Sequence, residues 1–320
     1  MIRKGIWWVP GAALVLLLPG RWALDALLLE EDTGLYRDNG QWSFILLGAF
    51  VVVGLALLLL CRLDKKAPVL WSPRSLPVSG VLAILAGAMV LYSSVLSVVQ
   101  LSRGELDTSS ASLAGEQPLL TALTSVLGLL AALSIMVWGG SLLNRGTLFQ
   151  DHPIAGLFPP VWGCLELAAM FVNSAAEASV QENFYSVLPF GLCVLFLFGQ
   201  SSYFSSVGGP VSRRRMYQYG APFVLLGLGG SLPPLVCLAM GIPAAETDSL
   251  PFLGMLLLFS LYALSVLWSL RREESRSRLH PVSVRLSSTA DLDRVVMEWR
   301  QKQITRKDTP TGESPAGKSE

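Results

Sequence analysis

Three ionisable residues interrupt long apolar segments of this sequence, and chemistry would first be sought at these buried charges. They are Arg21, Asp25 and Glu166. A charged side chain is expensive to bury among apolar residues, so it is typical of ion pairs, solute paths and proton relays. Arg21 and Asp25 are four residues apart, which places them on one face of a helix. Arg21 and Glu166 fall at similar depths in their segments, and we hypothesise a buried ion pair between them.

The residues alone leave the role of such a pair open. It could hold two helices together, serve transport or a proton relay, or act in acid–base catalysis. Trp162 lies four residues before Glu166 and Asn173 lies seven after it, so the three share one helix face. This polar stripe could line a cavity, and it could equally form a seam between helices.

A second candidate is a segment rich in glycine and proline between Gly227 and Pro234. Glycine weakens a helix, and proline removes a backbone donor. A helix broken near Gly229, Gly230 and Ser231 would free backbone groups, as in the ion and substrate sites of transporters. The alternative is a kink that neighbouring helices fill.

A third candidate is the polar run that begins at Gln200 and continues through Ser201, Ser202 and Tyr203. Such residues commonly form hydrogen bonds between membrane helices. The other interpretation is that they face a pore.

Enzyme and metal signatures are not found in the sequence. It has no HExxH, GxSxG or Walker motif, and its two histidines and four cysteines form no zinc-binding pattern. The four cysteines, none in a CxxC pair, are typical of small apolar core side chains. We therefore expect no enzyme activity, no catalytic residue, no metal and no cofactor. A net charge of +1 gives no basic field that would favour nucleic acid.

The elements that must position these residues are apolar segments of about 20 residues. Hydrophobic residues make up 52% of the chain and charged residues only 15%, against about 25% charged in soluble domains. Each segment can cross a hydrocarbon core as a helix, because lipid cannot satisfy an open backbone. The sequence predicts an all-α polytopic transmembrane helix bundle in 1–270, with eight spans at about 6–29, 43–61, 78–99, 120–143, 154–175, 186–207, 219–240 and 251–270. In the alternative, the first is a secretory signal cleaved near Ala23, which leaves seven.

The loop charges predict the orientation of the bundle. Alternate loops, beginning with the N-terminus, hold 21 of the 24 lysines and arginines, and the loops on the other side hold only Arg37 and Arg103. Positive residues concentrate on the cytoplasmic side of membrane proteins. We therefore expect both the N-terminus and the C-terminus in the cytoplasm.

The tail after the last span is expected in two parts. Residues 271–307 read as a basic cytoplasmic segment with one short amphipathic helix, and 308–320 as disordered. The apolar face of that helix would be formed by Leu292, Val295, Val296 and Trp299. It could lie on the membrane, pack under the bundle, or dock a protein partner.

The second half of the chain, about 150–270, resembles a loose group of uncharacterised bacterial multi-pass integral membrane proteins. The residues that carry the resemblance are Pro160 and Trp162, Glu182-Asn183, Phe196-Leu197-Phe198 with Gln200, and Arg213-Arg214-Arg215 before Gly220. The resemblance implies the bacterial cytoplasmic membrane and no assigned activity.

Two functions are consistent with these observations. The first is a permease-like protein for a small solute or ion, whose pathway would include Glu166, Asn173, Arg21, Gly229, Gly230, Ser231 and Gln200. The second is a non-catalytic membrane scaffold or sensor that recruits a partner through its tail. A permease needs a continuous polar cavity that reaches the membrane midplane, whereas a scaffold would show the same polar groups satisfied in a dry bundle.

Overall fold

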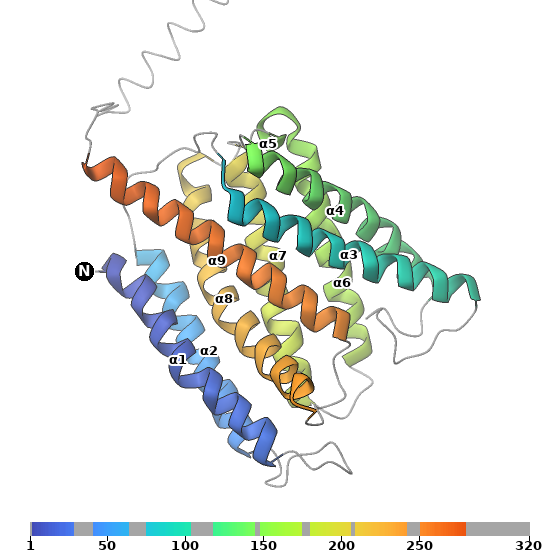
Figure 1. Cartoon of the computed structure of the whole chain (residues 1–320), viewed down its shortest axis with the longest axis horizontal. Helices are drawn as coiled ribbons and strands as arrows, with labels where there is room; N and C mark the ends of the chain where they lie inside the picture. The colour runs from blue at the N-terminus through green and yellow to red at the C-terminus, as the bar shows by residue number, and fades with distance from the viewer. Residues whose placement is uncertain are drawn as a thin grey trace, which may run out of the picture. The chain divides into compact units, whose positions relative to one another are not determined.

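The computed structural model describes the backbone of residues 2–28, 41–63, 75–103, 118–144, 148–174, 180–205, 209–241 and 250–279. Within these ranges the chain is helical (Figure 1), with elements α1 (Ile2–Leu28), α2 (Gln41–Leu63), α3 (Pro77–Arg103), α4 (Pro118–Asn144), α5 (Leu148–Asp151), the 3-10 helix η1 (Pro153–Leu157), α6 (Phe158–Ser174), α7 (Val180–Phe204), α8 (Gly209–Ala239) and α9 (Leu250–Leu279). The all-α prediction is confirmed. The amphipathic tail helix and the disordered tail both lie outside the described residues.

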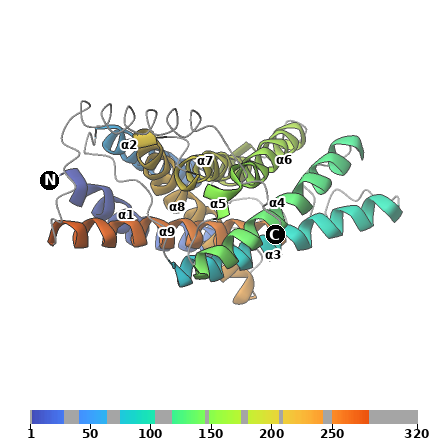
Figure 2. The same ribbon diagram turned by 90° about the horizontal axis from the view of Figure 1, so that it is seen from above.

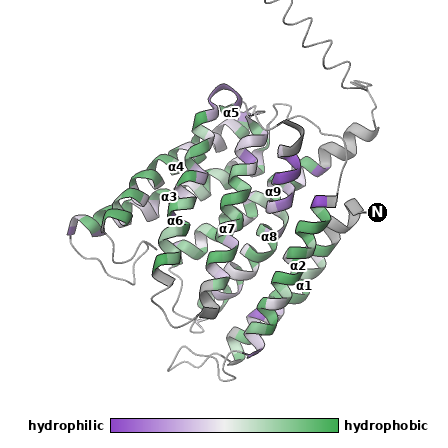
Figure 3. Cartoon of the chain, turned by 180° about the vertical axis from the view of Figure 1, so that it is seen from behind, coloured by the Kyte–Doolittle hydropathy of each residue, from purple (hydrophilic) through white to green (hydrophobic). Residues whose placement is uncertain are grey.

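Seven of the described helices are long and apolar enough to cross a membrane, namely α2, α3, α4, α6 with η1, α7, α8 and α9. An eighth, α1, carries a shorter apolar stretch over Val9–Leu24. Figure 3 shows apolar colour along most of each helix. Each of the eight predicted spans falls on one of these helices. The fifth differs at its start, because η1 and a helix start at Phe158 replace a uniform helix from residue 154.

The helices of the unit formed by residues 1–271 are arranged around α8. Helices α1 and α2 pack on α8, and α7 packs on it as well. From α7 the neighbours continue through α6 and α4 to α3 (Figures 1 and 2). Hydrogen bonds tie α9 to α4 through Trp138 and Tyr262, and to α3 through Ser79 and Ser265.

Burial separates the central helix from those with an outward face. In the apolar window of α8, 67% of the residues are buried, against 28% in α2. Every residue from Gly220 to Ser231 is buried. By contrast, Leu16, Val52 and Leu119 are exposed large apolar side chains. An apolar exterior of this kind suits lipid as the surrounding solvent.

Helices α3 and α4 approach each other so closely that their backbones touch. A Cβ atom on Gly80 would lie 2.8 Å from the carbonyl oxygen of Gly139, and one on Gly139 would lie 2.7 Å from that of Gly80. Small residues allow this approach, which replaces the hydrophobic driving force that lipid does not supply. The pair therefore presents a fixed arrangement of side chains to its neighbour α6.

Candidate solute site between α3, α4 and α6

Glu166 lies in a pocket where three helices contribute polar side chains. Glu166 and Trp162 come from α6, one turn apart on the same face. The rest of the lining consists of hydroxyl residues, namely Ser93, Ser94 and Ser97 from α3 and Thr124 and Ser125 from α4. Glu166 is half-buried, and Trp162 is buried. The carboxyl group therefore has polar neighbours inside an otherwise apolar bundle.

Most of the hydroxyl protons in this pocket are already used within their own helices. Ser97 donates to the carbonyl of Ser93 at 3.0 Å, and Ser93 donates to that of Val90 at 3.0 Å. On α4, Ser125 donates to the carbonyl of Thr121 at 2.7 Å, and Thr124 donates within the preceding turn. A hydroxyl that has donated its proton still has lone pairs to offer. The pocket is thus mainly a set of acceptor oxygens.

The pocket is small. The space open to the centre of a water molecule is about 10 Å³, which is about what a single water needs. The continuous polar cavity expected of an open permease is not seen in the described part of the chain. The pocket has room for one particle of about the size of a water molecule.

The pocket lies closer to one end of the bundle than to the middle of α3 and α4. Ser97 is six residues before the end of α3, which is about 9 Å of helix. Thr124 and Ser125 lie in the second turn of α4.

The hypothesised ion pair between Arg21 and Glu166 is wrong. Helix α1 packs on α2 and α8, whereas α6 packs on α4, α7 and η1. Within the described residues, Glu166 has no ion pair with Arg21 or with any other cation. Similar depth in two helices does not make them neighbours, and here α7 and α8 lie between them in the order of packing.

Arg21 has partners of a different kind. Its guanidinium carbon lies 3.8 Å from the centroid of the Tyr185 ring, and Nη1 donates to Ser43 Oγ at 3.5 Å. The Tyr185 hydroxyl donates to the carbonyl of Ser43 at 3.3 Å. A cation over an aromatic face is stabilised by the ring quadrupole. Arg21 thus links α1, α2 and α7, and the side chain of Asp25 lies outside the described residues.

The break considered for the glycine- and proline-rich segment does not occur, because α8 continues as an α-helix from Gly209 to Ala239. Neighbouring side chains and backbone fill the space beside each glycine. A Cβ on Gly229 would lie 2.7 Å from the Phe50 ring, and one on Gly230 would lie 2.7 Å from the carbonyl oxygen of Tyr185. Ser231 is fully buried and donates to the carbonyl of Gly227 at 2.6 Å. This segment is a packing core.

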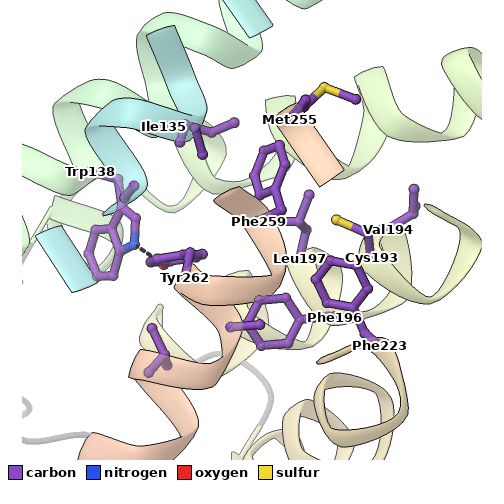
Figure 4. Close-up of a cluster of buried hydrophobic side chains, with 14 of the residues drawn as sticks. Ile135, Trp138, Cys193, Val194, Phe196, Leu197, Phe223, Met255, Phe259 and Tyr262 are labelled. Atoms are coloured by element: carbon purple, nitrogen blue, oxygen red, sulfur yellow. Dashed lines mark hydrogen bonds between the residues drawn. The ribbon is translucent and has the colours of Figure 1, made fainter. Parts of the chain in front are cut away.

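Gln200 belongs to a separate buried cluster near the other end of the bundle. Trp138 Nε1 donates to the Tyr262 hydroxyl at 2.9 Å, as Figure 4 shows, and the side chain of Gln200 interacts with the same hydroxyl. Gln200 Oε1 is buried without a hydrogen-bond partner in the described structure. Ser201, its neighbour, donates to the carbonyl of Gly156 in η1. These residues mostly connect helices, in line with the first interpretation of the run.

The structure brings together only part of the predicted polar stripe. Trp162 and Glu166 share the pocket, whereas the side chain of Asn173 lies outside the described residues. The five hydroxyl residues of α3 and α4 were not among the residues predicted from the sequence. Their signal was present, because Ser93 and Ser97 lie one turn apart in an apolar span, as do Thr121 and Ser125.

The fold and the pocket together define a multi-pass α-helical membrane protein with one half-buried carboxyl group in a cluster of hydroxyls. Comparisons with family models, with curated proteins and with solved structures gave no significant match.

Proposed function

We propose that this protein is permease-like and moves a small solute or ion across a bacterial cytoplasmic membrane, with Glu166 at the solute site. The observation that carries the proposal is the pocket of acceptor oxygens around that carboxyl group. Ionisable residues inside spans are rare and are concentrated on solute and ion paths. A carboxylate among hydroxyl oxygens attracts a cation, so the solute or its coupling ion is expected to be positively charged.

The partners of Glu166 favour this function over a purely structural one. A structural carboxylate in a membrane core is normally held by a cation or by several donors. Glu166 has no ion pair in the described part of the chain, and four of the five hydroxyls near it donate to their own helices instead. The site is therefore left able to accept a mobile positive charge.

The second candidate, a membrane scaffold or sensor, is favoured by the packing of α8. Neighbouring residues fill the space beside the glycines of this helix, and the Ser231 hydroxyl donates to a carbonyl of the same helix. A scaffold is expected to have such a dry interior, in which the polar groups are hydrogen-bonded within the bundle. The tail that would recruit a partner lies outside the described residues. A transport measurement must therefore distinguish the scaffold from the permease-like protein.

The test is cation flux into liposomes that contain the full-length protein. Vesicles loaded with indicators for Na⁺, K⁺ and pH receive a gradient of each cation, and radiolabelled methylammonium serves as a small organic cation. We expect the wild-type protein to pass at least one of these cations faster than protein-free vesicles. Glu166→Gln keeps the size of the side chain but removes its charge, and it should slow that flux at least tenfold.

The matched control is Ser102→Ala, which removes a hydroxyl from the same helix outside the pocket, where it donates to the Val99 carbonyl. This variant should behave like the wild type. Flux equal to that of protein-free vesicles for all four cations would contradict the proposal and support the scaffold. Unchanged flux in folded Glu166→Gln would remove Glu166 from the pathway.

A further inference from the structure

The lining of the pocket has the composition of a site for a hard cation. All six of its candidate ligands are oxygens, namely the carboxylate of Glu166 and the hydroxyls of Ser93, Ser94, Ser97, Thr124 and Ser125. Hard cations prefer oxygen ligands, whereas transition metals favour nitrogen and sulfur. No histidine or cysteine lines the pocket, and no cluster of three or more His, Cys, Asp or Glu occurs in the described residues.

The state of the hydroxyls supports binding of a cation rather than an anion or a neutral donor-seeking solute. Ser93, Ser97, Thr124 and Ser125 each direct a proton to a carbonyl of the preceding turn. Their lone pairs remain for another ligand. Glu166 adds the negative charge of its carboxylate to these acceptor oxygens.

Charge and size restrict the ion further. Glu166 is the only acidic residue of the lining, so a monovalent ion would neutralise the site, and a divalent ion would leave a buried positive charge. The space open to the centre of a water molecule is about 10 Å³. This suits one ion that has exchanged its water for protein oxygens. Mg²⁺ usually keeps several waters and would not fit in that form.

We therefore infer that the pocket between α3, α4 and α6 binds one alkali-metal cation directly, through Glu166 and the surrounding hydroxyl oxygens. The inference deepens the proposed function, because it names the ion class of the same site. Binding can be measured without transport, so the two can fail separately.

The experiment measures the thermal unfolding midpoint of the purified full-length protein in detergent. LiCl, NaCl and KCl are each compared with N-methyl-D-glucamine chloride at equal ionic strength, which removes general screening effects. An ion that binds only the folded protein raises the midpoint progressively as its concentration exceeds the dissociation constant. We expect at least one alkali ion to do so, whereas N-methyl-D-glucamine is too large for the pocket.

Variants locate the binding. Glu166→Gln should abolish the shift produced by the ion, and Ser97→Ala should weaken the apparent affinity about tenfold through loss of one oxygen ligand. Thr124→Val, which replaces a hydroxyl by a methyl group of similar size, provides a second loss of ligand if Glu166→Gln does not fold. Ser102→Ala should leave the shift unchanged.

The inference is overturned if none of the three ions shifts the midpoint relative to N-methyl-D-glucamine. It is equally overturned if the shift persists in Glu166→Gln, or, where that variant does not fold, in both Ser97→Ala and Thr124→Val. Binding without any cation flux would support the site but contradict the permease-like function. Flux without alkali-ion binding would support the function and identify a proton or an organic cation as the solute.

Discussion

Arg21 and Glu166, the two candidate ionisable residues whose side chains are described, are accommodated by different means. Arg21 lies over the Tyr185 ring and donates to Ser43, which lets it connect three helices. Glu166 instead shares a pocket with five hydroxyl residues, four of which donate to carbonyls of their own helices. A fixed cation with its own partners is a structural element, whereas a carboxyl group among acceptors is suited to a mobile cation. We therefore expect Arg21 to contribute to stability and Glu166 to contribute to function.

The bond between Trp138 and Tyr262 gives a prediction on stability. Both side chains are almost fully buried, and Trp138 Nε1 donates to the tyrosine hydroxyl across α4 and α9 (Figure 4). Tyr262→Phe leaves the indole N–H without this acceptor, and we expect a loss of about 1–2 kcal/mol. Unfolding of the purified protein by titration with sodium dodecyl sulfate measures this loss.

Tyr92→Phe is the control for that variant, because Tyr92 is an exposed tyrosine on α3. It should change the free energy of unfolding by less than about 0.5 kcal/mol. Equal effects of the two substitutions would show that the buried hydrogen bond contributes nothing measurable.

At the scale of helices, α8 is the element on which the others are assembled. Its glycines let α2, α7 and α9 approach from different sides, at Gly229, Gly230 and Gly227 respectively. Close approach of this kind is how membrane helices gain packing energy. The same glycines that suggested a broken transport helix are therefore explained by packing.

Gly230→Ala tests this packing. The added Cβ would lie 2.7 Å from the Tyr185 carbonyl oxygen, which belongs to the backbone and cannot rotate away. We expect a loss of about 1–3 kcal/mol in the free energy of unfolding, because α7 and α8 must separate. Gly140→Ala on α4 is the matched control, since no atom lies within 4 Å of its added Cβ. A neutral Gly230→Ala would contradict the close packing of α7 on α8.

The sequence was sufficient to predict the helices, but not which helices pack against each other. Apolar length predicts each span, because a membrane requires helices of about 20 residues. The depth of a residue in its own span does not determine which helices are neighbours. For this reason the predicted ion pair between Arg21 and Glu166 was wrong. The serine and threonine residues one turn apart on α3 and α4 could have indicated part of the pocket. Their spacing alone does not predict that α6 packs beside them. Glu166 itself was identified, because a charge in an apolar span is conspicuous.

At the scale of the whole molecule, the helices of residues 1–271 place the closely packed α8 apart from the pocket. One side of α8 carries α1 and α2, and beyond α7 the neighbours α6, α4 and α3 form the pocket. The pocket therefore lies where the tight α3–α4 pair meets α6.

The proposed function depends most on this pocket being the route of the solute, and Gly128→Ala tests that route without removing a charge or a hydroxyl. A Cβ at this position on α4 would overlap Ser94 Oγ and lie 3.1 Å from Trp162 Nε1, so these two lining residues of the pocket must shift. The decisive measurement is cation flux in vesicles that contain Gly128→Ala, beside Gly140→Ala, which adds the same methyl group on the same helix in open space. We predict that flux is lost at least tenfold in Gly128→Ala and kept in Gly140→Ala. Wild-type flux through a folded Gly128→Ala protein would contradict the account.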